Sequence, residues 1–255
     1  MENAGLVGLS RQIALQRELD VVANNVANLN STGYKADKVV FHEHLMPVAR
    51  ANQFRGGDRQ LSFVQDRATW LDLGQGPVLQ TGNPLDVAVS DNAFLKVQTP
   101  RGERYTRNGA LQINSTGQLV TSEGLAVLGV NGPIVFQPND RNGAISTDGT
   151  ISVREGQSTV DSLRGKLRLA TFAQPQQLQK DGTSTYMAPA GVQPDAAPTA
   201  RVTQGVIEKS NVHGVTEMTR MIEVTRTYTQ LASMLQQQSE MRRTAIEKLA
   251  EVPNA

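Results

Sequence analysis

The residues that could do chemistry in this chain are few and widely spaced. Cysteine is absent, so disulfides, cysteine nucleophiles and cysteine metal sites are excluded, and histidine occurs only 3 times. The nearest approach to a metal motif is His42-Glu43-His44. A spacing of two places both imidazoles on one face of a strand, but no third ligand follows and the spacing is not that of a zinc protease. We therefore expect exposed connector residues there, no metal and no cofactor.

Acidic residues are numerous enough, in principle, for the carboxylate pair of a glycosidase. The candidates are Asp86, Asp91, Glu103, Asp148 and Asp161. Asp148 precedes a glycine and Asp91 lies in a predicted loop, so turn formation explains both better. Asp86 lies within a strand pattern and could be a buried structural hydrogen-bond acceptor. Trp70 could stack on a sugar, but a single tryptophan more often packs in part against the protein. Gly74-Gln75-Gly76 precedes no predicted helix and does not resemble a phosphate-binding loop.

Composition narrows the class of protein further. The 255 residues include 25 Lys and Arg and 24 Asp and Glu, a formal net charge of +1, and 4% aromatic residues. A near-zero charge argues against binding to nucleic acid and opposes self-association only weakly. No segment approaches the ~20 apolar residues of a membrane helix, so no membrane insertion is predicted. The N-terminus lacks the basic start and apolar run of a signal peptide, which indicates a cytosolic protein or export without a cleavable signal.

Both ends of the chain carry the apolar spacing of long helices. In the first segment the stripe consists of Leu15, Leu19, Val22, Val26 and Leu29. Its three–four spacing predicts a helix over residues 4–30, which ends before the glycine of Asn30-Ser31-Thr32-Gly33. In the last segment the stripe consists of Met221, Val224, Tyr228, Leu231 and Leu235, widened by Met218 and Ile222. This spacing predicts a helix over residues 215–249, with Ser210-Asn211 or Thr216 as the N-cap.

The middle of the chain has the alternation of short strands. The predicted strands lie around 85–89, 94–97, 111–113, 125–128, 134–136, 151–153 and 167–169. Turn dipeptides such as Asn108-Gly109, Asn131-Gly132 and Asp148-Gly149 separate them, since these residues tolerate positive φ. Many short strands with frequent turns indicate an antiparallel sandwich or barrel.

We therefore predict an α+β protein in which an antiparallel, mostly β domain is inserted between long N- and C-terminal amphipathic helices. The predicted divisions are an N-terminal axial helix (1–35), an extended connector (36–80), a β-rich core (81–187), a return linker (188–209) and a C-terminal axial helix (210–255). Each helical stripe must be buried, either in an intramolecular helical hairpin or against other subunits, and the pattern favours neither.

Polar residues within the first helix favour packing against other subunits. Asn24, Asn25 and Asn28 are mediocre helix formers, and their amides can both donate and accept hydrogen bonds, so we assign them a packing role. The predicted subunit interface combines these asparagines with the two apolar stripes. It comprises Leu15, Leu19, Val22, Asn24, Asn25, Val26, Asn28, Leu29, Met218, Met221, Ile222, Val224, Tyr228, Leu231 and Leu235.

Four motifs in order resemble the rod and hook family of flagellar axial proteins. They are the stretch Val21-Val22-Ala23-Asn24-Asn25-Val26-Ala27-Asn28-Leu29-Asn30-Ser31-Thr32-Gly33-Tyr34-Lys35, the stretch Thr81-Gly82-Asn83-Pro84-Leu85-Asp86-Val87-Ala88-Val89, Arg104-Tyr105-Thr106-Arg107-Asn108-Gly109, and Ser210-Asn211-Val212. The length and the opening residues are most similar to the proximal rod members of that family, with distal rod members as the alternative.

The resemblance implies a structural, non-enzymatic subunit of the bacterial flagellar rod, the drive shaft that crosses the periplasm. It implies assembly with itself and with other proximal and distal rod proteins. It also implies secretion in an unfolded state through the flagellar type III export apparatus. A less favoured hypothesis, which rests only on the β core, Trp70 and the acidic residues, is a secreted domain that binds or hydrolyses peptidoglycan or carbohydrate.

Overall fold

The chain forms two compact units. The computed structural model describes residues 2–46, 61–90 and 92–250, and the side chains of residues 7–40, 70–90, 92–141 and 143–248. What we call the helical unit consists of Met1–Val26, Asp37–Trp70 and Gly214–Ala255. The β unit consists of Ala27–Ala36 and Leu71–His213. The helical unit therefore draws on both ends of the chain, and the β unit is inserted between them.

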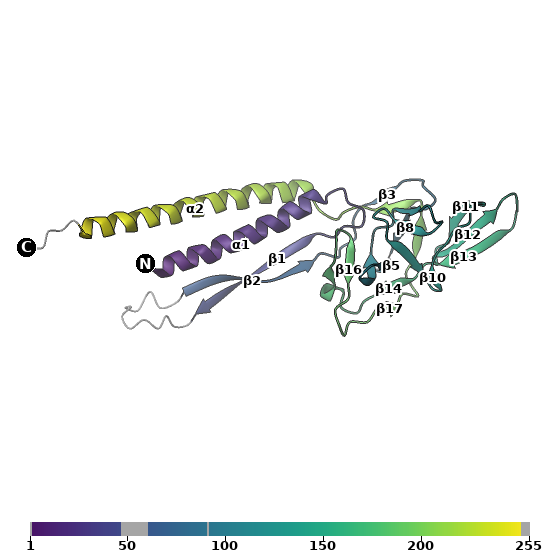
Figure 1. Cartoon of the computed structure of the whole chain (residues 1–255), viewed down its shortest axis with the longest axis horizontal. Helices are drawn as coiled ribbons and strands as arrows, with labels where there is room; N and C mark the ends of the chain where they lie inside the picture. The colour runs from purple at the N-terminus through teal and green to yellow at the C-terminus, as the bar shows by residue number, and fades with distance from the viewer. Residues whose placement is uncertain (1, 47–60, 91, 251–255) are drawn as a thin grey trace, which may run out of the picture. The chain divides into compact units, whose positions relative to one another are not determined.

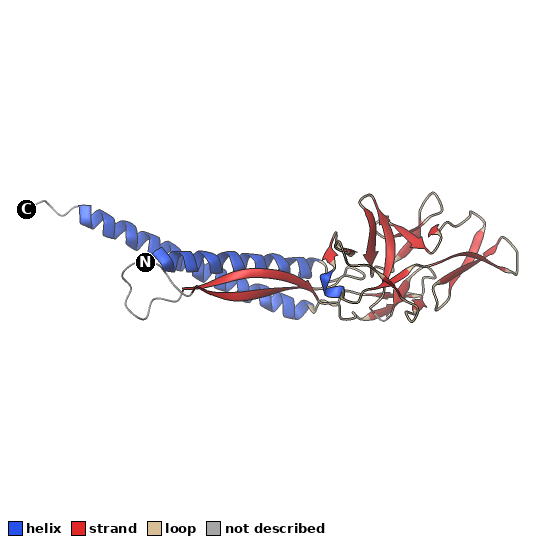
Figure 2. Cartoon of the chain, turned by 90° about the horizontal axis from the view of Figure 1, so that it is seen from below, coloured by secondary structure: helices blue, strands red, loops and turns tan. Residues whose placement is uncertain are grey.

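The helical unit contains two helices and one small sheet. Its elements are α1 (Glu2–Ala27), β1 (Asp37–Met46), β2 (Leu61–Leu71) and α2 (Gly214–Ala250). Figures 1 and 2 show α1 and α2 running alongside each other, with the paired strands β1 and β2 beside them. Over the described residues, neither helix has a stretch that is long and apolar enough to cross a membrane.

The helices lie close to where the apolar spacing predicts them. α1 ends at Ala27, three residues before the predicted end, because Asn28 and Ser31 begin a turn. The Ser31 backbone N–H donates to the Asn28 carbonyl at 3.2 Å, and the Ser31 hydroxyl donates to Asn28 Oδ1 at 3.0 Å. Gly33 then adopts a φ of +69°, the left-handed conformation expected of the capping glycine.

The predicted N-caps of the last helix are wrong. α2 begins at Gly214, so Thr216 lies inside the helix. Ser210 uses its hydroxyl to accept from the Val212 backbone N–H at 3.2 Å. Asn211 is engaged with backbone groups of other segments of the β unit, described below. A local turn at Ser210 and long-range hydrogen bonds at Asn211 thus take the place of a helix cap at these residues.

The β unit is built from short strands. Its strands are β3 (Val78–Gln80), β4 (Val87–Val89), β5 (Phe94–Thr99), β6 (Gly102–Thr106), β7 (Leu111–Ile113), β8 (Leu119–Thr121), β9 (Ala126–Gly129), β10 (Gly132–Pro133), β11 (Asp140–Ile145), β12 (Thr150–Glu155), β13 (Asp161–Lys166), β14 (Leu169–Thr171), β15 (Gln179–Lys180), β16 (Thr185–Met187), β17 (Asp195–Ala196), β18 (Val202–Gln204) and β19 (Val206–Glu208). A single turn of 3₁₀ helix, η1 (Pro175–Gln177), precedes β15.

The pairing of these strands is antiparallel. The largest sheet runs β15-β16-β6-β5-β9-β8-β7, with β10 added to β9, β14 added to β5 and β17 added to β14. A second sheet has the order β11-β12-β13, and two further pairs are β18–β4 and β19–β3. Consecutive strands joined by tight turns at Asp148-Gly149 and Asn131-Gly132 agree with the turn chemistry of the sequence.

The core of the β unit lies between these sheets. One buried cluster is aliphatic at its centre and includes Val87, Leu95, Leu119, Ile151 and Val202. A second buried cluster contains four aromatic side chains, Phe94, Tyr105, Phe172 and Tyr186. These rings meet edge to face, with Phe94 and Tyr186 centroids 5.7 Å apart. These apolar residues are buried, which explains why they alternate with polar residues in the sequence of the strands.

One predicted strand does not form. Residues 134–136 contribute only an isolated bridge between Val135 and Gln118, although Ile134 and Phe136 are buried. Their apolar character therefore reflects packing into the core and not a strand. Residues 36–80 and 188–209, the predicted connector and linker, contain β1 to β3 and β17 to β19. The coarse prediction of an α+β protein with a mostly antiparallel β region between two helices is confirmed.

Candidate functional site

The two helices of the helical unit form an antiparallel pair. Four contacts at successive levels join them: Gly8 with Leu235, Gln12 with Tyr228, Glu18 with Arg220, and Asn25 with Glu217. The partner's number in α2 falls as the number in α1 rises, so the helices run in opposite directions. The intramolecular helical hairpin that the sequence leaves open therefore exists in the single chain.

The contacts of this pair are closely spaced and partly polar. A Cβ on Gly8 would lie 2.6 Å from Leu235 Cδ2, so the missing side chain lets the helices approach there. The Gln12 amide donates to the Tyr228 hydroxyl at 3.1 Å. Arg220 Nη2 lies 2.7 Å from Glu18 Oε1. Glycine inside a helix costs about 1 kcal/mol relative to alanine, and here its small size permits the close packing.

The predicted interface residues of α2 separate into two groups. Val224 is buried, and Met221, Tyr228, Leu231 and Leu235 are half-buried. Their spacing places them on one face of α2, the face that includes the contacts to α1. This group accounts for the three–four stripe in the sequence.

The second group of α2 side chains points elsewhere. Met218 is 50% exposed and Ile222 is 69% exposed, and Val215, one turn before Met218, is 83% exposed. At about 100° per residue, Ile222 lies roughly 160° around the helix from Val224. Met218 and Ile222 therefore do not widen the inner stripe, as the sequence pattern predicts, but form a separate outer patch together with Val215.

The predicted residues of α1 show a similar division. Val22 is 2% exposed and Asn25 is 1% exposed. Leu15, Leu19, Val26, Asn28 and Leu29 are half-buried, and Asn24 is exposed. Sequence analysis did not include Leu9 and Ile13 in the interface, yet they are 50% and 59% exposed.

Asn25, near the C-terminal end of α1, contacts two other elements of the helical unit. Its Nδ2 donates to the Asp37 carbonyl at 2.9 Å and to Glu217 Oε2 at 3.3 Å, and its Oδ1 accepts from the Asp37 backbone N–H at 2.9 Å. One amide thus joins α1, the first residue of β1 and the first turn of α2. The predicted packing role fits Asn25, whereas the neighbouring Asn24 lies on the exposed side and Asn28 forms the local turn.

The β unit contains a buried ion cluster that sequence analysis missed. Lys35, Arg107 and Glu208 have side chains that are 0%, 2% and 1% exposed. Lys35 Nζ lies 2.5 Å from Glu208 Oε1, and Arg107 Nη1 lies 3.1 Å from Glu208 Oε2. The backbone N–H of Gly76 also donates to Glu208 Oε1 at 2.9 Å. One carboxylate is therefore shared by two cations that come from distant segments.

Burial and ion pairing act in opposite directions on Lys35. Desolvation is the largest effect and lowers the pKa of Lys35 below its usual value, while the Glu208 carboxylate works against this shift. Lys35 Nζ also donates to the Gly74 carbonyl at 2.7 Å. The ammonium group is thus held by its partners in a place where an unpaired charge would be costly.

Further hydrogen bonds surround the ion cluster, where the chain enters the β unit near Gly33 and leaves it near Asn211. Gly33 donates its N–H to the Glu208 carbonyl at 2.8 Å, and a Cβ there would lie 2.3 Å from the Arg107 carbonyl carbon. Asn211 Oδ1 accepts from the Ala36 N–H at 2.8 Å, and its Nδ2 donates to the Asp72 carbonyl at 2.7 Å. Three of the four motifs that carry the family resemblance therefore meet here.

The residues considered for catalysis have structural contacts. Asp148 accepts from the Thr150 N–H at 3.1 Å and pairs with Lys166, which is the turn role expected of it. Asp86 is buried and accepts from Asn83 Nδ2 at 3.0 Å, as expected of a structural acceptor. Asp161 pairs with Arg154, and Glu103 pairs with Lys96. Each of these carboxylates is thus held by its own hydrogen bond or ion pair in a turn or a strand.

The remaining candidates are Trp70, Asp91 and the two histidines of the His42-Glu43-His44 stretch. The Lys38 ammonium lies 5.3 Å from the centroid of the half-exposed Trp70 ring. Asp91 and the side chains of His42 and His44 lie outside the described residues. Among the side chains that the structure describes, no cluster of three His, Asp or Glu could hold a metal ion.

Comparison with known proteins gives matches along the whole chain. Residues 6–35 match the family described as flagella basal body rod protein, residues 88–153 the flagellar hook protein FlgE/F/G D1 domain, and residues 203–248 the flagellar basal body rod FlgEFG protein C-terminal family. The chain is 38% identical to the flagellar basal-body rod protein FlgF of Caulobacter vibrioides, over 99% of this chain and 100% of that protein.

Two further relatives support the same assignment. FlgF of Mesorhizobium japonicum is 34% identical over 98% of both chains. The flagellar basal-body rod protein FlgG of Bacillus subtilis is 30% identical over 86% of this chain and 88% of that protein. The chain belongs to the family of flagellar basal-body rod proteins, which are structural components of the rod in the basal body. Within that family it is similar to the FlgF proteins over nearly its full length.

Proposed function

We propose that this chain is a subunit of the proximal part of the rod and that its terminal helices serve two purposes. The inner faces of α1 and α2 pair within one chain, as the contacts from Gly8–Leu235 to Asn25–Glu217 indicate. The outer patch of Val215, Met218 and Ile222 packs against neighbouring subunits. In this proposal both helices are amphipathic. The α2 helix presents apolar side chains to α1 on its inner face and to neighbouring subunits on its outer patch.

The exposure of the outer patch is the observation that carries this proposal. Isolated exposed apolar residues are common, but three within two turns of one helix are a feature of interaction surfaces. The middle of each helix adds a further candidate, since Ile13 on α1 and Met234 on α2 are 59% and 66% exposed. We therefore extend the predicted interface to these residues.

The proposed partners are other copies of this chain and the other proximal and distal rod proteins. The relatives of both kinds, FlgF and FlgG, carry the name of basal-body rod proteins, which supports partners of this class. We further propose export in an unfolded state through the flagellar type III apparatus, with no nucleic acid partner, no membrane insertion and no catalytic activity. The absence of cysteine suits repeated unfolding, since no disulfide has to be reduced.

The five divisions of the sequence belong to the same proposal. Residues 1–35 and 210–255 act as axial helices, residues 36–80 and 188–209 connect them to the β-rich region, and residues 81–187 form its core. The strand pair β18–β4 supports a return segment that is attached to this core, and the pair β19–β3 joins the same segment to the connector.

Replacing Ile222 by glutamate tests the outer patch. Because Ile222 is 69% exposed, the variant should fold with an unchanged unfolding transition. A carboxylate in a subunit contact would have to be desolvated, so we expect incorporation into purified hook–basal bodies to fall more than about tenfold, with loss of motility. Incorporation is measured by quantitative mass spectrometry of the particles.

Gln237→Glu is the matched control, since it adds the same charge at an exposed position of the same helix. It should leave incorporation unchanged. Normal incorporation of the Ile222→Glu chain at normal cellular levels would remove the outer patch from the proposal.

A further inference from the structure

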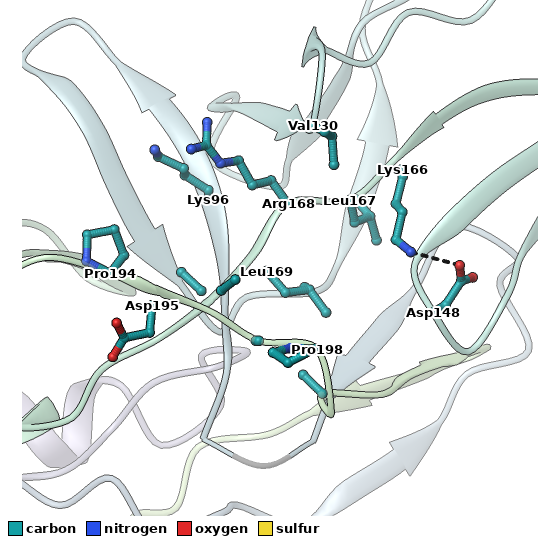
Figure 3. A pocket seen from close by; sticks show the side chains of 14 residues that line it. Lys96, Val130, Asp148, Lys166, Leu167, Arg168, Leu169, Pro194, Asp195 and Pro198 are labelled. Atoms are coloured by element: carbon teal, nitrogen blue, oxygen red, sulfur yellow. Dashed lines mark hydrogen bonds and ion pairs between the residues drawn. The ribbon is translucent and has the colours of Figure 1, made fainter.

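A pocket of about 480 Å³ opens in the β unit, between β14, β17 and the ends of β9 and β13. Its floor and walls are aliphatic, and Figure 3 shows Leu169 and Pro198 at its centre. The Lys96 and Arg168 side chains lie together on one side, Asp195 lies on another, and Lys166 with Asp148 lies at the far end. This volume falls within the range of ligand pockets, about 300–1,000 Å³.

Most of the charges around the pocket already have partners. Lys166 Nζ lies 2.9 Å from Asp148 Oδ2, and Lys96 pairs with Glu103. In the part of the chain that the structure describes, the Arg168 guanidinium and the Asp195 carboxylate form no ion pair. The pocket therefore offers one cation and one anion to an incoming partner.

The lining indicates which kind of partner fits. Apart from the charged groups, it consists of valine, leucine, alanine and proline, and it includes neither an aromatic ring nor a side-chain amide. Sugar recognition commonly uses aromatic faces and amides, whereas aliphatic walls with an arginine suit a peptide that carries an aliphatic side chain beside a carboxylate. The chemistry thus favours a protein segment over a glycan.

A segment of the same chain has this combination of groups. The loop between β12 and β13 ends at Val160, which is 74% exposed. The Ser158 hydroxyl accepts from the Val160 N–H at 3.1 Å and so orders the loop. Beside it, Arg154 Nε and Asp161 Oδ1 lie 2.9 Å apart on the paired strands. Their side chains are 49% and 58% exposed, so this pair is worth little and can be exchanged.

The loop cannot enter the pocket of its own chain. β13 begins at Asp161, next to the loop, and ends at Lys166, which lines the pocket. Five residues of extended strand place these ends about 17 Å apart. Because a strand cannot fold back on itself, an occupant with the sequence of this loop must come from a second copy.

We propose that the Val160 loop of one copy inserts into the Arg168 pocket of a neighbouring copy. Val160 then packs on the aliphatic floor, Asp161 pairs with Arg168, and Arg154 pairs with Asp195. The inserting loop and the receiving pocket are different surfaces, so the contact is heterologous and repeats without closing, as a helical rod requires. This inference rests on the proposed assembly function and adds a contact between β units to it.

Charge reversal tests the pairing of Asp161 with Arg168. Arg168→Glu and Asp161→Arg should each place like charges in contact and lower incorporation into hook–basal bodies by more than about tenfold. The double variant restores an opposite pair in every contact and should recover incorporation to within about threefold of the natural chain. Both residues are exposed, so thermal unfolding of each variant should be unchanged.

Disulfide trapping tests the identity of the occupant, because the natural chain has no cysteine to interfere. Val160→Cys and Ala196→Cys chains, expressed together and oxidised in purified particles, should form a dimer that contains one of each. Ile113→Cys, an exposed position on β7, replaces Ala196→Cys as the control and should form none.

Three results would overturn the inference. They are unchanged incorporation of both single variants, no recovery in the double variant, and a disulfide from Val160→Cys or Ala196→Cys to a different protein only. If Ile222→Glu still blocks incorporation while the Arg168 and Asp161 variants do not, the proposed function stands and the loop-in-pocket contact fails.

Discussion

At the scale of single residues, Glu208 has the largest expected effect on stability. Its carboxylate is the ion-pair partner of both Lys35 and Arg107, and all three side chains are at most 2% exposed. Glu208→Gln keeps the size of the side chain and removes the charge. Two buried cations would then lose their counter-ion, so we expect the free energy of unfolding to fall by about 3–5 kcal/mol in urea titrations.

A matched variant shows whether the loss of stability depends on the burial of the glutamate or only on its removal. Glu247→Gln removes an ion pair with Arg243 on α2, whose side chains are 59% and 83% exposed. Its effect should stay within about 0.5 kcal/mol, because exposed pairs contribute little. Equal effects of the two variants would contradict a stabilising role for the buried cluster.

At the scale of elements, the helix pair depends on the inner face of α1. Val22 is 2% exposed, and Val22→Asp would bury an unpaired carboxylate in the helical unit. We expect this variant to lose assembly and motility, because the cost of about 3 kcal/mol or more falls on the helices. The β unit should stay folded, as shown by retained hydrogen-exchange protection of its core strands.

The neighbouring residue provides the comparison for this change. Ala23 is exposed on the same helix, so Ala23→Asp adds the same group without burying it. It should leave the amides of α1 and α2 as protected as in the natural chain. Full motility of the Val22→Asp chain at normal protein levels would show that this helix face is dispensable.

At the scale of the whole molecule, the pH dependence of stability follows from aspartates of the β unit. The Lys166 and Thr150 hydrogen bonds lower the pKa of Asp148 to about 2. Arg164 lowers the pKa of Asp140, and Arg104 lowers the pKa of Asp181. As pH falls, the unfolded chain binds protons before the folded one, so this stability is complete above about pH 5 and is lost between about pH 4 and 2.

Melting temperatures of the full chain from pH 7 to pH 2 would measure this loss. Asp148→Asn removes one of the contributing carboxylates, so its melting temperature should fall less steeply through the acid range than that of the natural chain. An equally steep fall would exclude a contribution from Asp148. A melting temperature that is constant from pH 5 to pH 2 would contradict the low pKa values of all three groups.

Local patterns were sufficient to predict both helices and some of the strands of this protein. The three–four spacing of Leu15 to Leu29 and of Met221 to Leu235 predicts both helices, because a helix must place its apolar residues on one side. For a similar reason, alternation predicts six of the strands, namely β4, β5, β7, β9, β12 and β14, and the other strands are not predicted from it. The four motifs carry the family resemblance, which the comparisons confirm.

Long-range contacts decided which side chains those elements present and to what. Met218 and Ile222 are apolar like the inner stripe, yet they lie away from the face of α2 that contacts α1 and are exposed. Asn24 and Asn25 are the same residue type, but only the fold places the backbone of Asp37, at the start of β1, where it forms hydrogen bonds with Asn25. Glu208, Lys35 and Arg107 are each unremarkable in their local sequence and meet only through folding. Periodicity is a property of neighbours along the chain, whereas burial and pairing depend on segments that are distant in sequence.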